Sequence, residues 1–223
     1  MKIQYGMLFA SVVLSLDVYA SKPLINLTFV FAVEPSKINE KQYNQIARQE
    51  TQVLNQYFIG QDGKEIFNFK LKNHVDYKSF KNMKCGLSET LNKKAVINSE
   101  KVKTQFNQCF KNPNNVYVFI YDAYAPSNGW ADATSWGFNN NHRPFVLLDW
   151  KRLNYNQQAA LPHEMGHAFG LRHVCISKAQ RQDSTNIMAS AGNCDGSGGK
   201  RNIGFNPNQL NIILEHYRKL SSN

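Results

Sequence analysis

The sequence predicts one folded domain of mixed α/β or α+β class. Hydrophobic residues make up 42% of the 223 residues, a share typical of globular proteins and too high for an intrinsically disordered one. The length favours one domain. The order of the expected elements is strand, helix, strand, then two or three further strands, a helix, irregular chain and a last helix. This order indicates a sheet covered by helices.

The first twenty residues resemble an export signal. Lys2 supplies a positive start, residues 7–16 are apolar, and small or β-branched residues precede the expected cut after Ala20. Ten apolar residues are too few to span a membrane, which takes about 20, and no later segment approaches that length. We therefore expect a signal peptide over residues 1–20, a mature domain over residues 21–223, and a secreted or periplasmic location. Ser21, in place of a cysteine, argues against a lipid anchor.

The N-terminal half predicts strands that alternate with helices. Residues 24–33 are rich in β-branched and aromatic side chains and predict a buried strand. Asn39 is a suitable cap for an amphipathic helix that runs to about Phe58. Residues 66–71 alternate as a second strand. Residues 74–112 are polar and predict a helix or two.

The second half predicts the remaining strands and two helices. Residues 116–121 are almost wholly apolar and predict a central strand, and residues 143–149 predict another. Residues 129–141 are expected to form a strand edge or a long loop. A helix is expected from about Asn156, followed by irregular chain over residues 170–205. The last helix is expected to be capped by Asn206, with an apolar face made of Leu210, Ile213, Leu214 and Tyr217.

Four cysteines lie in the expected mature chain, at positions 85, 109, 175 and 194. In an oxidising compartment an even number indicates disulfides, and three connectivities are formally possible. We favour Cys85–Cys109 and Cys175–Cys194, because each closes a local loop and would stabilise the fold by about 3 kcal/mol. A four-cysteine zinc site is not favoured, because the chain has no C-x-x-C spacing.

The basic charge does not indicate a specific partner. Lysine and arginine number 26 against 16 acidic residues, for a net charge of +10, but the charges are scattered and favour a solvated surface over nucleic-acid binding. The glycine-rich residues 192–201 lack the spacing of a phosphate loop. Calcium is possible but unsupported, because the candidate aspartates lack EF-hand spacing and favour surface or capping roles. These aspartates are Asp122, Asp132, Asp149, Asp183 and Asp195.

The distinctive chemistry lies in residues 163–173, which read HEMGHAFGLRH. His163 and His167 are four apart, so on a helix both imidazoles project from one face. Gly170 is the natural helix end, because a left-handed residue there costs glycine little. The chain can then turn back and bring His173 as a third ligand, which leaves one tetrahedral position open for water, as in catalytic zinc sites. Glu164, beside the metal, can accept a proton from that water.

This pattern resembles the signature of the metzincin clan of zinc metalloendopeptidases, His-Glu-x-x-His-x-x-Gly-x-x-His. Residues 186–189, Asn-Ile-Met-Ala, resemble the methionine-containing turn of that clan. The resemblance implies one catalytic zinc on His163, His167 and His173, Glu164 as general base, and Met188 as the hydrophobic floor below the metal. It also implies a twisted, mostly parallel sheet with an antiparallel edge strand, an N-terminal subdomain over residues 21–170, and an irregular C-terminal subdomain over residues 171–223 that ends in a helix.

The residues of the motif and of the turn do not assign the chain to one metzincin subfamily. Ser190 stands where astacin-like and serralysin-like members have an additional tyrosine ligand, so matrixin-like and reprolysin-like members are more similar. The proline that commonly follows the matrixin methionine is absent, and no propeptide with a cysteine switch is expected. Pro162, directly before the first ligand, indicates a helix that is kinked or starts late.

The expected function is a secreted zinc-dependent metalloendopeptidase that acts as a monomer on protein or peptide substrates. An extended substrate would add as a strand along the sheet edge, expected at residues 131–138. The alternative is a secreted binding or inhibitory module on an inactive metzincin scaffold, against which the intact Glu164 argues. A third hypothesis is an exported protein that binds nucleic acid or the cell envelope; only the net positive charge supports it.

Overall fold

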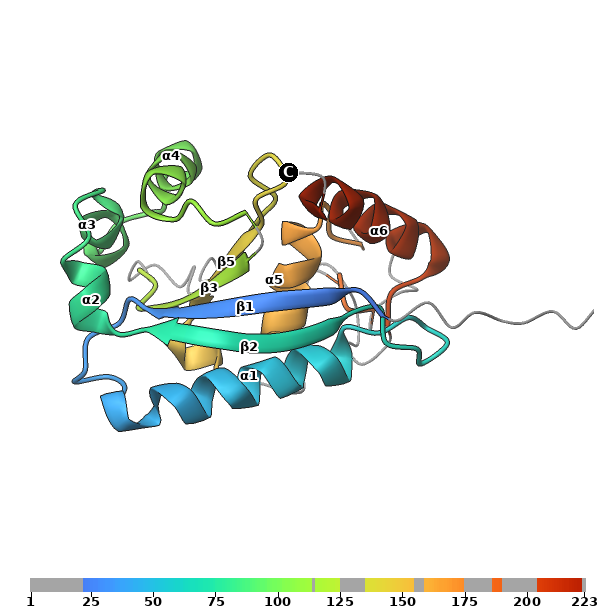
Figure 1. Cartoon of the computed structure of the whole chain (residues 1–223), viewed down its shortest axis with the longest axis horizontal. Helices are drawn as coiled ribbons and strands as arrows, with labels where there is room; N and C mark the ends of the chain where they lie inside the picture. Colours follow the sequence, from blue (N-terminus) through green and yellow to red (C-terminus); the bar gives the residue numbers. More distant parts are fainter. Residues whose placement is uncertain are drawn as a thin grey trace, which may run out of the picture.

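The computed structural model of the chain describes residues 22–113, 115–124, 135–154, 159–174, 186–189 and 204–221. These residues form a five-stranded sheet of order β2-β1-β3-β5-β4 with helices on both faces (Figure 1). The strands are β1 (Leu24–Phe31), β2 (Asn68–Val75), β3 (Asn115–Tyr121), β4 (Trp136–Phe138) and β5 (Phe145–Asp149).

The sheet is mostly parallel, with one antiparallel edge strand. β1 pairs in parallel with β2 and β3, and β3 pairs in parallel with β5. β4 runs antiparallel to β5 at the edge. β3 lies in the middle, and all of its residues are buried, as its apolar sequence predicts. The predicted fold class, a mixed α/β domain with a mostly parallel sheet, is confirmed.

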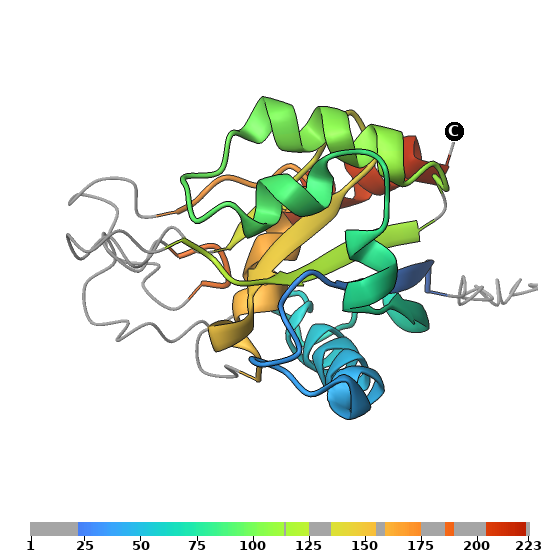
Figure 2. The same cartoon turned by 90° about the vertical axis from the view of Figure 1, so that its left-hand side faces the viewer.

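The two faces of the sheet pack against different helices. On one face, Phe29 and Phe31 of β1 join a core with α1 (Tyr43–Tyr57), α5 (Ala160–Ala168) and α6 (Pro207–Ser221). On the other face, Val30 joins a core with α2 (Tyr77–Lys81), α3 (Leu87–Asn92) and α4 (Ser99–Cys109). Figures 1 and 2 show α1 running along one side of the sheet and the α2–α4 layer on the other. Because strand residues alternate between faces, this arrangement follows from the strand pattern.

Asparagine side chains begin two of the helical segments, as predicted. Asn39 Oδ1 accepts from Lys41 N, 3.0 Å away, at the start of a short 3₁₀ turn (η1, Glu40–Gln42) that leads into α1. Asn206 Oδ1 accepts from Gln209 N at 3.0 Å, while Gln209 Oε1 accepts from Asn206 N at 2.9 Å. This reciprocal pair is a capping box, which satisfies N–H groups that the first turn of α6 leaves free.

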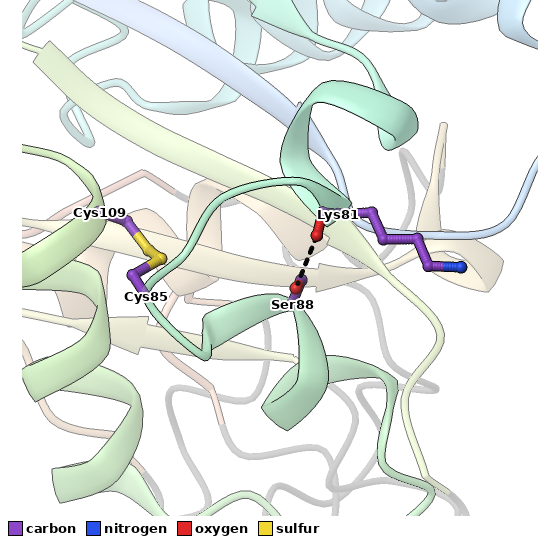
Figure 3. Close-up of a disulfide and its surroundings, with 4 residues drawn as sticks. All are labelled: Lys81, Cys85, Ser88 and Cys109. Atoms are coloured by element: carbon purple, nitrogen blue, oxygen red, sulfur yellow. Dashed lines mark hydrogen bonds between the residues drawn. A yellow bond between two sulfur atoms is a disulfide. The ribbon is translucent and has the colours of Figure 1, made fainter.

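The segment between β2 and β3 contains three helices, where the sequence predicted one or two. A disulfide between Cys85 and Cys109 ties the chain before α3 to the end of α4 (Figure 3). Beside it, Ser88 Oγ donates to Lys81 O at 3.5 Å and links α3 to α2 (Figure 3). The short helices bury few apolar residues each, so a covalent link between them adds stability that packing alone does not supply. Cys175 and Cys194, the other expected pair, lie outside the described residues.

The predicted second strand was misplaced. It was expected at residues 66–71, but β2 begins at Asn68 and runs to Val75. Lys72, Asn73 and His74 interrupt the apolar alternation. Asn73 and His74 still pair with β1, at Thr28 and Phe29, after a shift in register that leaves Lys72 without a partner in the ladder. β2 is an edge strand whose side chains are largely exposed, so hydrophobic alternation marks only its first half.

A short 3₁₀ helix, η2 (Trp150–Arg152), follows β5. Among the described residues, no helix has the length and apolar content needed to cross a membrane.

Glu50 is a buried carboxyl group on α1, and its side chain holds the chain after η2. Its exposed fraction is 1%, and its Oε1 accepts from Asn154 N at 2.6 Å. Burial raises the pKa of Glu50 from 4.5 to about 7, against the smaller lowering effect of the Asn154 hydrogen bond. The fold therefore prefers the neutral carboxyl group.

This preference predicts a pH-dependent stability. Because the pKa is raised on folding, the stabilising contribution is complete below pH 4.5 and is lost as the pH rises through 7. We expect Glu50→Gln, which keeps an oxygen for Asn154 N, to be more stable than the unsubstituted protein at pH 8, by up to about 3 kcal/mol, and equally stable at pH 4.5. Urea unfolding at both pH values measures the difference. An equal difference at the two pH values would contradict the assignment.

Candidate metal centre

Helix α5 carries the first two histidines of the motif. It begins at Ala160, after a gap in the described residues at 155–158, so Pro162 is its third residue. Proline there removes no helical hydrogen bond, because first-turn N–H groups have no acceptor within the helix. The regular bonding starts directly after it, where His163 N donates to Ala159 O at 2.9 Å. The helix therefore starts late, one of the two outcomes that Pro162 suggested.

The helix ends in a turn that Gly170 makes possible. The φ angle of Gly170 is +88°, in the left-handed region that glycine adopts without steric cost. Leu171 N donates back to Gly166 O at 3.0 Å, which reverses the chain and brings His173 towards α5.

The turn brings three imidazole nitrogens together. The Nε2 atom of His173 lies 3.0 Å from Nε2 of His163 and 3.0 Å from Nε2 of His167. Ligands of a tetrahedral zinc ion at 2.0–2.1 Å lie about 3.3 Å apart, so the spacing fits one such ion. Among the described residues, this is the only convergent group of three or more histidine, cysteine, aspartate or glutamate side chains.

Main-chain carbonyl groups determine which nitrogen of two rings faces the centre. His163 Nδ1 lies 2.7 Å from Ile187 O, and His167 Nδ1 lies 2.8 Å from Leu171 O. A carbonyl oxygen only accepts, so both Nδ1 atoms carry the proton and both Nε2 atoms present a lone pair. The donor set therefore fits a zinc ion in chemistry as well as in spacing.

The centre is open on one side. His163 is buried, with an exposed fraction of 2%, whereas His167 is half-buried and His173 is exposed. Among the described residues, the side of the group at His173 is therefore the one accessible to solvent.

Met188, the residue that the resemblance predicts as the floor of the site, packs against helix α5. It is fully buried, and its sulfur packs so closely on Gly166 that a Cβ at that position would overlap it. A turn holds it there, in which Ala189 N donates to Asn186 O at 2.8 Å and Val174 N donates to Met188 O at 2.9 Å. The turn and the chain that bears His173 are therefore linked.

Glu164 is half-buried on α5, directly after His163 and three residues before His167. Its charge acts on Tyr121 at the end of β3, where burial first, and then the charges of Asp149 and Glu164, raise the pKa of the tyrosine hydroxyl. Sequence analysis did not single out this tyrosine, because it is simply the last residue of an apolar strand.

Sequence analysis also did not predict that the buried amide side chains of Asn186 and Gln209 form hydrogen bonds with each other. They are 23 residues apart. Asn186 lies in the predicted methionine-containing turn, but nothing in the sequence indicated its pairing with Gln209. Asp122 and Asp149 are not members of the three-histidine group; Asp122 accepts from Trp150 Nε1, and Asp149 caps η2. The other expected site residues lie outside the described residues: Asp132, Asp183, Asp195, Ser190, Cys175 and Cys194.

Comparison with solved structures identifies a shared fold. The chain superimposes on the archaemetzincin of Methanopyrus kandleri with a TM-score of 0.51 and 14% identity, covering 90% of this chain and 99% of that one. Metalloproteinase-II of Bacteroides fragilis gives a TM-score of 0.45 at 12% identity, over 88% of this chain and 54% of that one. A zinc-dependent peptidase of Methanocorpusculum labreanum gives 0.41 at 14% identity, over 84% and 99%.

The first of these similarities shows that the chain has an archaemetzincin-like fold, and at this identity it shows the fold alone. No protein-family model and no curated protein sequence matches the chain.

Removal of one ring tests the metal centre directly. We expect His173→Ala to weaken zinc binding by at least about 100-fold, because two nitrogens leave the ion under-coordinated. Competition with a fluorescent zinc chelator measures the affinity. His74→Ala, an exposed histidine on the far edge strand β2, is the matched control and should bind zinc normally. Equal zinc affinity in both variants would contradict this ligand set.

Proposed function

We propose that the chain is a zinc-dependent metalloendopeptidase with one catalytic zinc ion on His163, His167 and His173. The observation that carries the proposal is the convergence of the three Nε2 atoms, two of them oriented by main-chain carbonyl groups. The archaemetzincin-like fold supports it, since it agrees with the metzincin-like motif at residues 163–173.

When bound, zinc supplies a Lewis acid that polarises a peptide carbonyl and lowers the pKa of water to about 7. Glu164 is the proposed general base. Its carboxylate takes a proton from the attacking water as the new C–O bond forms at the scissile carbonyl. It then delivers that proton to the amide nitrogen as the C–N bond breaks, so the products are an amine and a carboxylic acid, which releases its remaining proton to solvent at neutral pH.

The edge strand β4 is the proposed binding place for an extended peptide. Only β5 pairs with it among the described strands, so its other edge can accept a substrate strand. Gly137 in its middle lies so close to α5 that a Cβ would overlap Glu164 O. A peptide added to β4 therefore passes close to the residues that carry the proposed chemistry.

Several further parts of this proposal rest on the sequence alone. They are cleavage of a signal peptide after Ala20, a secreted or periplasmic location, a monomeric state, the two-subdomain division at residue 170 and the Cys175–Cys194 disulfide. Closer similarity to matrixin-like and reprolysin-like members than to astacin-like and serralysin-like ones rests on Ser190.

Substitution of the base tests the proposed chemistry. We expect Glu164→Gln to keep zinc bound and to lower hydrolysis of a quenched fluorescent peptide library by about 10²- to 10⁴-fold, because the amide cannot accept the proton. Glu100→Gln, an exposed acid on α4, is the control and should be fully active.

Turnover of Glu164→Gln near that of the unsubstituted protein would contradict the assignment of the base. An unsubstituted protein that binds zinc but hydrolyses no peptide in the library would instead favour the inactive scaffold.

A further inference from the structure

A buried pair of amides joins the turn at Met188 to the first turn of α6. Asn186 and Gln209 have exposed fractions of 2% and 7%. Gln209 Nε2 donates to Asn186 Oδ1 at 3.1 Å, and Asn186 Nδ2 donates to Gln209 Oε1 at 3.2 Å. The two side chains therefore pair face to face in an interior where an unmade hydrogen bond is costly.

Backbone groups fix the orientation of both amides. Asn186 Oδ1 also accepts from Met188 N at 2.8 Å, and Asn186 Nδ2 donates to Gly204 O at 3.4 Å. Gln209 Oε1 also accepts from Asn206 N at 2.9 Å. A main-chain N–H only donates and a carbonyl only accepts, so reversing either amide would place donor against donor or acceptor against acceptor. The two amide groups can therefore pair in only one orientation.

The pair is connected to the metal centre through the turn. Asn186 Oδ1 accepts a hydrogen bond from Met188 N. Ile187, the residue between these two, supplies the carbonyl oxygen that accepts from His163 Nδ1 at 2.7 Å. Displacement of the turn would move this acceptor and rotate the imidazole. It would also move Met188 away from Gly166.

We propose that Asn186 and Gln209 are positioning residues of the metal centre, through which the first turn of α6 sets the orientation of His163. The hydrogen bonds of the two side chains go to each other, to the turn, to Gly204 O and to the start of α6, so the action on the metal centre is indirect. The inference rests on the proposed function in one respect, namely that the three histidines bind zinc.

The test uses Gln209→Glu in the full chain. The carboxylate keeps the acceptor for Asn206 N, and thus the capping box, and an acidic group is favourable at a helix N-terminus. It lacks the donor to Asn186 Oδ1 and places oxygen against oxygen there. We expect zinc affinity to fall about 10-fold or more, as is typical when a group that orients a ligand is lost. We also expect an altered visible spectrum of the Co²⁺-loaded protein.

Two more variants separate positioning from general destabilisation. Gln209→Met has a similar length and adds no charge, so it replaces Gln209→Glu if that variant does not fold, and it should weaken zinc binding likewise. Asn55→Asp is the matched control, because Asn55 pairs with both Phe69 N and Phe69 O, at 2.9 and 3.0 Å, between α1 and β2. It should lower the thermal midpoint of the metal-free protein without changing zinc affinity or the Co²⁺ spectrum.

The inference is overturned if the Gln209 variants bind zinc within twofold of the unsubstituted protein and give the same Co²⁺ spectrum. It is also overturned if Asn55→Asp weakens zinc binding as much as they do. Absence of zinc binding in the unsubstituted protein is a different result, which would contradict the proposed function and, with it, this coupling.

Discussion

Two main-chain carbonyl groups, Ile187 O and Leu171 O, determine the orientation of two of the three histidine rings. Each accepts from an imidazole Nδ1 and so turns the Nε2 lone pair of His163 or His167 towards a common point. Much of the nearby structure serves to place these oxygens. The turn at Gly170 positions Leu171, and the turn around Met188, bonded to α6, positions Ile187.

The sheet supplies the rigid frame for this arrangement. α5 packs on the same face as α1, and the buried side chains of β1, β3 and β5 hold it there. The α2–α4 layer covers the opposite face and is cross-linked by the Cys85–Cys109 disulfide. The proposed chemistry and the disulfide-linked helices therefore lie on different sides of the sheet.

Local signals in the sequence predicted most of this framework. The apolar run of β3, the caps Asn39 and Asn206, and the helix end at Gly170 each depend on a few neighbouring residues. The spacing of His163 and His167 also sufficed to place both rings on one face of α5. The Asn186–Gln209 pair, the Glu50–Asn154 bond and the second half of β2 depend on contacts between distant segments. No periodicity or spacing encodes such contacts, so sequence reasoning missed them.

The central claim is that three imidazole Nε2 atoms hold one zinc ion. X-ray absorption spectroscopy at the zinc edge, on protein loaded with one equivalent, tests it most directly. The account predicts a first shell of nitrogen and oxygen only, at about 2.0–2.1 Å, with multiple scattering that fits three imidazoles. A sulfur ligand at about 2.3 Å, or a fit with fewer than three imidazoles, would contradict it.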